Sequence, residues 1–262
     1  MGLLTIVDPR FMISGFFVGL LIGQTGMGGG SLMTPLLVLL FGIHPSTAVG
    51  TDLLYASATK TVGTLVHGIN RTIDWRIVGR LAMGSVPATI ATLLFLARFE
   101  AGGGDTSRLI SVVLGAMLLV TSLSLIFRRA FLRLTEPLLE GLAPRQRRSL
   151  TVVTGLILGL LVTMSSVGAG ALGVTALIVL YPRERMATIV GSDIAHAVPL
   201  TLVAGVGHWY LGSVDWPLLS ALLSGSVPGI ILGSYLSAHV PDRFLRPILA
   251  FTLVVVGGRL VM

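Results

Sequence analysis

The sequence predicts an all-α, polytopic integral membrane protein built from two tandem repeats, and two observations carry this prediction. The first is composition: 53% of the 262 residues are hydrophobic, only 11% are charged, and the mean hydropathy is +0.93. A soluble domain of this size carries about 25% charged residues. A chain with so few charges cannot cover itself with a water-compatible surface, so lipid must be its solvent. The second observation is that rare residues recur at a fixed spacing in the two halves.

The repeated residues lie 141 positions apart from Gly50 onward and 140 apart upstream, where Gly28 and Gly30 match Gly168 and Gly170, so one residue was inserted near Arg183. We call such pairs repeat mates. The matched segments are Gly50-Thr51-Asp52 with Gly191-Ser192-Asp193, His67 with His208, Asp74-Trp75 with Asp215-Trp216, and Gly84-Ser85-Val86-Pro87 with Gly225-Ser226-Val227-Pro228. The matches include Asp, His, Trp and Pro, so they are not explained by the small alphabet that apolar helices share. The sequence therefore predicts a first membrane repeat over residues 1–128, an Arg-rich cytoplasmic connector over 129–148 and a second membrane repeat over 149–262.

Six apolar runs have the length of single crossings, since an apolar helix of about 20 residues spans the hydrocarbon core. These are Ser46–Gly68, Leu81–Ala97, Leu109–Phe127, Thr188–Gly212, Trp216–Ala238 and the shorter Pro247–Met262. Two of them are spans only if a single aspartate is tolerated in each.

The segments that open the two halves are predicted to be broken. Phe11–Ile43 and Ser149–Tyr181 are each uncharged for 33 residues, which as one straight helix would be about 50 Å long, against a core of about 30 Å. Glycine-rich stretches, residues 26–30 and 165–170, interrupt them, and glycine frees the backbone from helical geometry. Each arm is then 12 to 18 residues long, too short to span comfortably. We expect re-entrant hairpins or discontinuous helices with the glycines at their tips.

The cationic residues indicate topology rather than nucleic-acid binding. Seventeen arginines and one lysine give a net charge of +7, but they lie at the ends of apolar runs and not on one basic face. With the connector in the cytoplasm, re-entrant opening segments put 13 arginines inside and 4 outside, whereas full crossings give 11 and 6. The positive-inside rule therefore favours re-entrant segments. Three crossings per half make the repeats inverted.

The two glycine breaks are the predicted substrate site. Non-helical backbone at membrane depth must line a cavity or be buried in protein, and the amino terminus of a half-helix attracts an anion. The predicted substrate-binding residues are Gly26, Gly28, Gly29, Gly30, Ser31, Thr34, Thr51, Lys60, Ser165, Ser166, Gly168, Gly170 and Ser192. The alternative is that these glycines only permit close helix packing, as small residues do in membranes.

Ionisable residues inside the apolar spans are the predicted ion-coupling site. Asp52 and Asp193 are repeat mates, and His196 follows Asp193 by one helical turn. An ionisable group in lipid is costly and is a functional candidate, so we expect these residues to bind a coupling proton or sodium ion. The alternatives are that the carboxylates cap local backbone N–H groups and that His196 is simply packed and hydrogen-bonded. Lys60 either attracts the anion or extends its stem toward an interface.

Other classes of function are less favoured. The chain has no cysteine and no His-Glu-x-x-His pattern, so we expect no metal site and no cofactor. Ser165 or Ser166 with His196 or His208 could form a serine–histidine pair, but there is no nucleophile elbow. We therefore expect a transporter and not an enzyme. A passive channel is the close alternative, and a membrane scaffold without cargo is a more distant one.

The ordered set of motifs resembles a known family. Gly19-Leu20-Leu21-Ile22-Gly23 leads to Gly26-Met27-Gly28-Gly29-Gly30, Pro35 and Gly50-Thr51-Asp52, with a weaker copy at Gly168-Ala169-Gly170 and Gly191-Ser192-Asp193. Over the whole chain this set resembles the sulfite exporter (TauE/SafE) family of bacterial membrane permeases. The resemblance implies a multi-pass protein of the bacterial inner membrane that exports sulfite, sulfoacetate or a related sulfur oxyanion without ATP hydrolysis. The second copy departs from the pattern, since Thr175 stands where the first half has Pro35.

Overall fold

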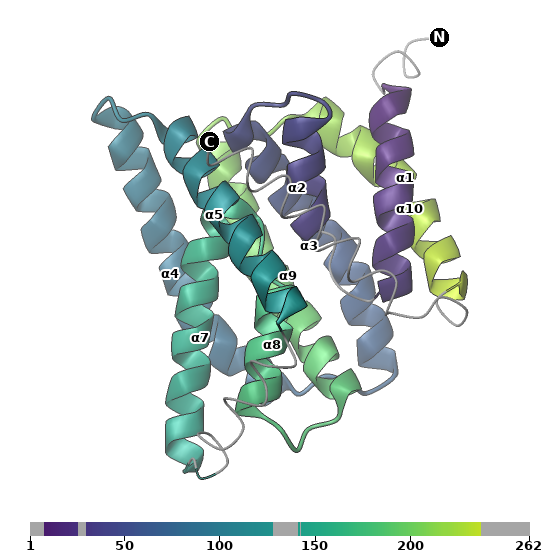
Figure 1. Ribbon diagram of the computed structural model, residues 1–262, viewed down its shortest axis with the longest axis vertical. Helices are drawn as coiled ribbons and strands as arrows, with labels where there is room; N and C mark the ends of the chain where they lie inside the picture. The colour runs from purple at the N-terminus through teal and green to yellow at the C-terminus, as the bar shows by residue number, and fades with distance from the viewer. Residues whose placement is uncertain (1–7, 26–29, 128–140, 142, 237–262) are drawn as a thin grey trace.

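The described residues fold into helices connected by short turns, with no strand among them (Figure 1). The computed structural model describes residues 8–25, 30–127, 141 and 143–236. The helices are α1 (Pro9–Thr25), α2 (Gly30–Leu39), α3 (Pro45–Ile69), α4 (Trp75–Ala101), α5 (Thr106–Ile126), α7 (Pro144–Ser165), α8 (Ala171–Leu180), α9 (Met186–Tyr210) and α10 (Trp216–Leu236). The predicted all-α class is confirmed.

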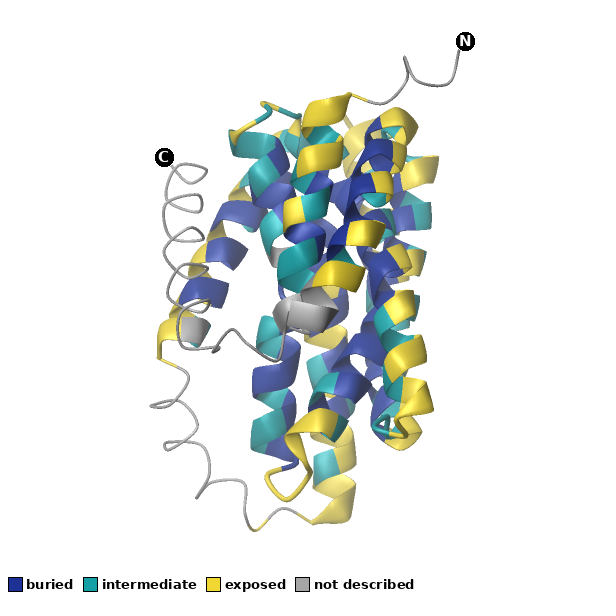
Figure 2. Ribbon diagram, turned by 90° about the vertical axis from the view of Figure 1, so that its right-hand side faces the viewer, coloured by how far each residue is buried: buried dark blue, intermediate teal, exposed yellow. Residues whose placement is uncertain are grey.

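Four of these helices are long and apolar enough to cross a membrane, namely α4, α5, α7 and α9. In the window that defines each span, 67% of α9 but only 33% of α4 is buried, so α9 is central and α4 peripheral. Large apolar side chains are exposed, and those of Phe17, Leu65, Leu94 and Leu123 are about 60% exposed. Exposed residues, yellow in Figure 2, run along the helices at the edge of the bundle. An outer surface of this kind suits lipid rather than water. The chain is a multi-pass membrane protein.

The predicted spans agree with the observed helices to within six residues at either end. α3 and α9 continue without interruption through Asp52 and Asp193. Both carboxylates therefore lie inside regular helix and not at a helix end. The predicted span Pro247–Met262 lies outside the described residues.

Both opening segments fold back on themselves, which corresponds to the hairpin, one of the two predicted alternatives. The first is interrupted between α1 and α2, and the second between α7 and α8. In the first, the Phe11 and Phe41 rings lie 4.8 Å apart. In the second, the hydroxyls of Thr151 and Tyr181 lie 2.8 Å apart. Each hairpin thus returns to the end at which it began.

One arm is longer than the sequence analysis expected. α7 begins at Pro144 rather than Ser149 and has 22 residues, so it is about 33 Å long and is not too short to span. Proline is favoured in the first helical turn, and the arginines that follow it belong to the helix although they lie beyond the apolar run. α8 has only 10 residues, about 15 Å, which is half of a crossing.

Each hairpin packs against the other half of the chain, α1 on α10 and α7 on α4. Gly15 lies against the carbonyl of Leu222, and Gly155 lies against the carbonyl of Leu81, so closely that a Cβ at either glycine would overlap the neighbouring backbone. Leu81 and Leu222 are repeat mates, and so are the two glycines, within one position. The same close contact therefore occurs twice: a glycine of the first half packs against the second half, and a glycine of the second half packs against the first.

The central helices α3 and α9 pack antiparallel. Gly50, near the start of α3, contacts His208, near the end of α9, and Gly191 contacts His67 in the same way. A two-fold axis that relates antiparallel helices lies across them, within the plane of a membrane that they span. Such an axis is characteristic of inverted repeats, so these reciprocal contacts support the predicted inversion.

The arginines of the described residues are concentrated at one end. α4, α7 and α9 begin there: Arg80 Nη1 donates to the Tyr181 hydroxyl at 3.1 Å, and the Arg147 guanidinium lies 5.8 Å from the centre of the Tyr181 ring. Connectivity places Arg71, Arg76, Arg80, Arg145, Arg147, Arg148, Arg183 and Arg185 at this end, and Arg10, Arg98 and Arg108 at the other. By the positive-inside rule, we expect the first end to face the cytoplasm.

Candidate functional site

Three charged side chains are buried within the described part of the chain, and all three lie in the central helices. Asp52 and Lys60 of α3 are 0% and 4% exposed, and Asp193 of α9 is 1% exposed. A buried charge is tolerated only where other groups compensate it. The surroundings of these three residues therefore define the candidate site.

The second glycine break provides the irregular backbone at this site. α7 ends at Ser165, its C-cap Ser166 has a left-handed φ of 56°, and Gly168 and Gly170 have φ of 111° and 120°. Only glycine adopts the last two conformations without strain. The backbone amides of residues 169 to 171 have no hydrogen-bond partner among the described residues. The break therefore leaves backbone donors without partners next to the start of α8.

The break lies about halfway across the bundle. Thr163, three residues before it, donates a hydrogen bond to the Thr89 hydroxyl at 3.1 Å. Thr89 is near the middle of α4, 14 residues from its first residue, Trp75, and 12 from its last, Ala101. At 1.5 Å per residue each distance is about 20 Å, so the unpartnered amides lie near the mid-depth of the longest span.

Lys60 extends from the first half of the chain into this break. Its Nζ donates to the carbonyl oxygen of Ala169 at 3.2 Å, and its burial shows that the alternative of a side chain extended to the interface is wrong. The Ser166 hydroxyl is 3% exposed, has no hydrogen-bond partner among the described residues and lies near the Asp52 carboxyl. An ammonium group and a free hydroxyl thus flank the unpartnered amides.

The two aspartates differ in their surroundings. Asp52 Oδ2 accepts a short hydrogen bond from Thr34 Oγ1 of α2. The repeat mate of Thr34 is Val174, which has no hydroxyl to donate, and neither oxygen of Asp193 has a hydrogen-bond partner in the described part of the chain. Neither carboxylate caps local backbone amides, which was the alternative interpretation of both residues. One oxygen of Asp52 is held by a hydrogen bond and the other has no partner among the described residues, whereas both oxygens of Asp193 lack one.

Asp193 lies against the first turn of α8. Gly173, the third residue of α8, is so close that a Cβ there would overlap Asp193 Oδ1. Lys60 interacts electrostatically with Asp193 and with Asp52 but forms a hydrogen bond with neither. The carboxylate of Asp193 is therefore near the positive end of a helix and near an ammonium group without being bound by either.

His196 is packed and hydrogen-bonded, as the alternative interpretation proposed. Its Nε2 lies 2.8 Å from the Ser85 hydroxyl of α4, and its Nδ1 has no partner among the described residues. The repeat mates of these two residues, Tyr55 and Ser226, also form a hydrogen bond of 2.8 Å. The sequence analysis did not select Ser85, Tyr55 or Ser226. The duplicated Gly-Ser-Val-Pro motif and the spacing of Tyr55 and His196 were the available signals.

Three further predicted residues hold other parts of the fold. Thr51 Oγ1 accepts a hydrogen bond from the Asp215 amide at 3.1 Å, and Ser192 Oγ accepts one from the Asp74 amide at 2.9 Å. Ser165 donates to the Leu161 carbonyl in its own helix at 2.7 Å. These hydroxyls position the helices around the site and do not point at the charged cluster in this structure.

The first glycine break is only partly visible. Gly26, Gly28 and Gly29 lie outside the described residues, as does the side chain of Ser31, and Gly30 is the first residue of α2. One turn further on, Thr34 reaches Asp52.

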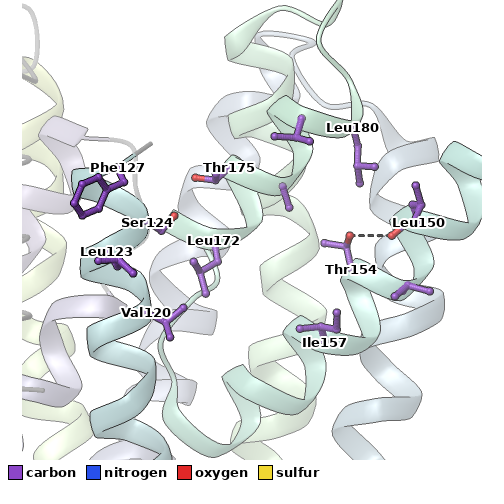
Figure 3. A pocket seen from close by; sticks show the side chains of 13 residues that line it. Val120, Leu123, Ser124, Phe127, Leu150, Thr154, Ile157, Leu172, Thr175 and Leu180 are labelled. Carbon is purple, nitrogen blue, oxygen red and sulfur yellow. Dashed lines mark hydrogen bonds between the residues drawn. The ribbon is translucent and has the colours of Figure 1, made fainter. Parts of the chain in front are cut away.

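A separate cavity of about 630 Å³ lies between α5, α7 and α8 (Figure 3). Its walls are mostly aliphatic, including Leu123, Leu150, Ile157 and Leu172, with no charged side chain. Its polar groups are the hydroxyls of Ser124, Thr154 and Thr175, and the last two already donate to carbonyls of their own helices, so it offers an anion no cation and few donors. In the described part of the chain, no group of three or more His, Asp or Glu residues could hold a metal ion.

Comparison with known proteins identifies a consistent set of relatives. The family model described as "Sulfite exporter TauE/SafE" matches residues 11–260. The chain is 40% identical over 256 residues to the probable membrane transporter protein YjnA of Bacillus subtilis, covering 97% of this chain and all of that protein. It is 24% identical over 268 residues to the probable membrane transporter protein MJ0441 of Methanocaldococcus jannaschii, covering 95% and 93% of the two chains. No solved structure matches.

Proposed function

Because the chain belongs to the sulfite exporter TauE/SafE family of membrane transporters, we propose that it is a secondary transporter that exports a small anion, sulfite or a related sulfur oxyanion such as sulfoacetate. The observation that carries the proposal is the contact between Lys60 and Ala169. It brings a buried ammonium group to unpartnered backbone amides near the mid-depth of the bundle. We expect no cofactor and no catalysis.

The donors at the second break suit an oxyanion. Sulfite has three oxygens, each with lone pairs that accept hydrogen bonds, so a site for it requires several converging donors. The Lys60 ammonium, the Ser166 hydroxyl and the amides of residues 169 to 171 are such donors. Charge-assisted hydrogen bonds are roughly twice as strong as neutral ones. In this proposal the anion replaces the Ala169 carbonyl as the partner of Lys60.

The two halves of the chain, residues 1–128 and 149–262 with the connector 129–148 between them, are in this proposal inverted repeats. The reciprocal glycine contacts and the antiparallel packing of α3 on α9 support it. Binding sites of inverted-repeat transporters lie where the halves meet, and the opposite repeats alternate in opening the site to either side. Lys60 from the first half and the break in the second half meet at such a place.

Asp52, Asp193 and His196 are the proposed ion-coupling residues. Export against a gradient without ATP requires a second solute, and a proton or a sodium ion binds to buried carboxylates. Asp193 is the better candidate because its oxygens have no partner in the described part of the chain, whereas Asp52 is held by Thr34.

The test is sulfite flux in liposomes that contain the purified protein. Flux should saturate with sulfite concentration, and preloading the vesicles with unlabelled sulfite should accelerate uptake of labelled sulfite. Such countertransport distinguishes a transporter from a passive channel. Gly29→Leu combined with Gly168→Leu should abolish flux, and normal flux in this variant would refute the site assignment.

The enzymatic alternative finds no support in the geometry. His196 Nε2 faces Ser85, and His208 Nε2 lies 2.9 Å from the carbonyl oxygen of Thr163. Neither histidine has Ser165 or Ser166 as its hydrogen-bond partner. A serine nucleophile requires a base within hydrogen-bond reach, so we favour transport.

A further inference from the structure

The carboxylate of Asp193 occupies an unusual position at the second break. It is 1% exposed, its two oxygens have no hydrogen-bond partner among the described residues, and it rests against Gly173 in the first turn of α8. α8 starts with the N-cap Gly170, directly after the glycine break. The amino-terminal turn of a helix favours a negative group, and this one already has a negative group beside it.

The surroundings of Asp193 are those expected for a bound anion. Lys60 is the cationic group that interacts with it, and the same Lys60 binds the carbonyl of Ala169 beside the unpartnered amides. Burial of a carboxylate without hydrogen bonds is costly. The repeat mate Asp52 reduces that cost with one hydrogen bond from Thr34 to its Oδ2, although its Oδ1 has no partner among the described residues. Val174 gives Asp193 no such partner, so no hydrogen bond from the described residues holds the Asp193 carboxylate beside the first turn of α8.

Resting on the proposed function, we infer that the Asp193 carboxylate is a built-in competitor of the transported anion: both use the amino terminus of α8 and the Lys60 ammonium, and the anion binds fully only when Asp193 is neutralised by a cation or moves aside. The Asp193 carboxylate and the transported anion are both negative and repel each other when both lie beside the amino terminus of α8. The competition gives a physical reason for coupling, since a cation that neutralises Asp193 makes room for the anion. Asp52 differs because one of its oxygens accepts a hydrogen bond from Thr34, which lowers the cost of its burial.

Glycine at position 173 is part of this arrangement. A Cβ at Gly173 would overlap Asp193 Oδ1, so any other residue would push the carboxylate off α8. The repeat mate of Gly173 is Met33, a large side chain that is fully buried. The first half thus has a buried methionine at the position where the second half has a glycine against a carboxylate.

The test is equilibrium binding of radiolabelled sulfite to the purified full-length protein, with sulfoacetate and thiosulfate as further probes. Asp193→Asn keeps the shape and removes the charge, so it should bind sulfite about tenfold more tightly. The matched variant Asp52→Asn should change the sulfite affinity by a factor at least five times smaller than the factor for Asp193→Asn. Asp193→Asn should also uncouple sulfite flux from an imposed proton or sodium gradient.

A second substitution tests the same idea with the opposite sign. Val174→Thr gives Asp193 the hydroxyl that Thr34 gives Asp52, which should hold the carboxylate in place and weaken sulfite binding about fivefold. This near-isosteric change keeps the inference testable if Asp193→Asn does not fold, as judged by gel filtration and thermal unfolding.

The outcomes separate the two proposals. If the wild-type protein binds sulfite and Asp193→Asn binds it equally or more weakly, or if both asparagine variants tighten binding alike, the inference is overturned and the proposed function stands. If neither the wild type nor any variant binds sulfite, sulfoacetate or thiosulfate, the proposed function fails, and this inference fails with it.

Discussion

Replacing Lys60 by methionine is the substitution that most directly perturbs the proposed anion site. Methionine keeps much of the length and volume of the lysine stem and removes the ammonium group that contacts Ala169. Lys60 is the one lysine in the sequence, and the other strongly basic residues are arginines. Among the described residues no other lysine or arginine side chain is buried, so no neighbouring positive charge can replace that of Lys60.

The expected loss of affinity follows from two opposing interactions. An anion about 4 Å from the ammonium, at an effective dielectric constant of about 20, is attracted by about 4 kcal/mol. To bind it, Lys60 gives up the Ala169 carbonyl, and a hydrogen bond to a charged group is worth about 1.5–3 kcal/mol. The difference is about 2 kcal/mol, which corresponds to an affinity about 30-fold lower in Lys60→Met.

The assay is sulfite binding, followed by flux in liposomes, with the repeat mate of Lys60 as the matched control. Thr201 donates to the Ala197 carbonyl of its own helix at 2.8 Å, so Thr201→Val should leave sulfite affinity within about twofold of wild type. A folded Lys60→Met protein that binds and transports sulfite like the wild type would refute the assignment of Lys60 to the site.

Three further predictions follow from the packing and the topology. Gly155→Ala should lower the unfolding free energy by about 1–3 kcal/mol because its Cβ meets the Leu81 backbone. Gly79→Ala, with nothing within 4 Å, is the control in thermal unfolding, and equal stability of the two would contradict the close α4–α7 contact. Ser85→Ala should leave His196 Nε2 unpartnered and cost about 1–3 kcal/mol by the same measurement; no change would show that the contact is not formed. Since the chain has no cysteine, Glu184→Cys should resist a membrane-impermeant maleimide in intact cells and Gly103→Cys should react, and the reverse pattern would invert the proposed orientation.

The sequence predicted the class of fold because composition and spacing depend little on tertiary detail. A chain with 11% charged residues must be surrounded by lipid, and apolar runs of about 20 residues must be helices there. The glycine breaks were predictable for a similar reason, since φ of 111° at Gly168 and 120° at Gly170 is available to few other residues. The start of α7 at Pro144 was not predicted because the arginines in its first two turns interrupt the apolar run, although they belong to the helix.

The candidate site was only partly predictable because its contacts join distant segments. Lys60 and Asp193 could be selected one at a time from the rarity of charge in apolar helices. Their surroundings could not: Lys60 meets Ala169 across 109 positions of sequence, and Ser85 meets His196 across 111. The two aspartates differ because Thr34 of α2 donates a hydrogen bond to Asp52, whereas the matching residue of α8 is Val174. This difference could be connected to the aspartates only after the packing of α2 and α8 was known.

A structure determined with sulfite bound would test the central claim most directly. The account predicts the sulfur atom beside the break at residues 168–170, with its oxygens within hydrogen-bond distance of Lys60 Nζ and the amides of residues 169 to 171, and the Asp193 carboxylate displaced from Gly173. Sulfite bound elsewhere, with Lys60 still on the Ala169 carbonyl and Asp193 still against α8, would contradict it.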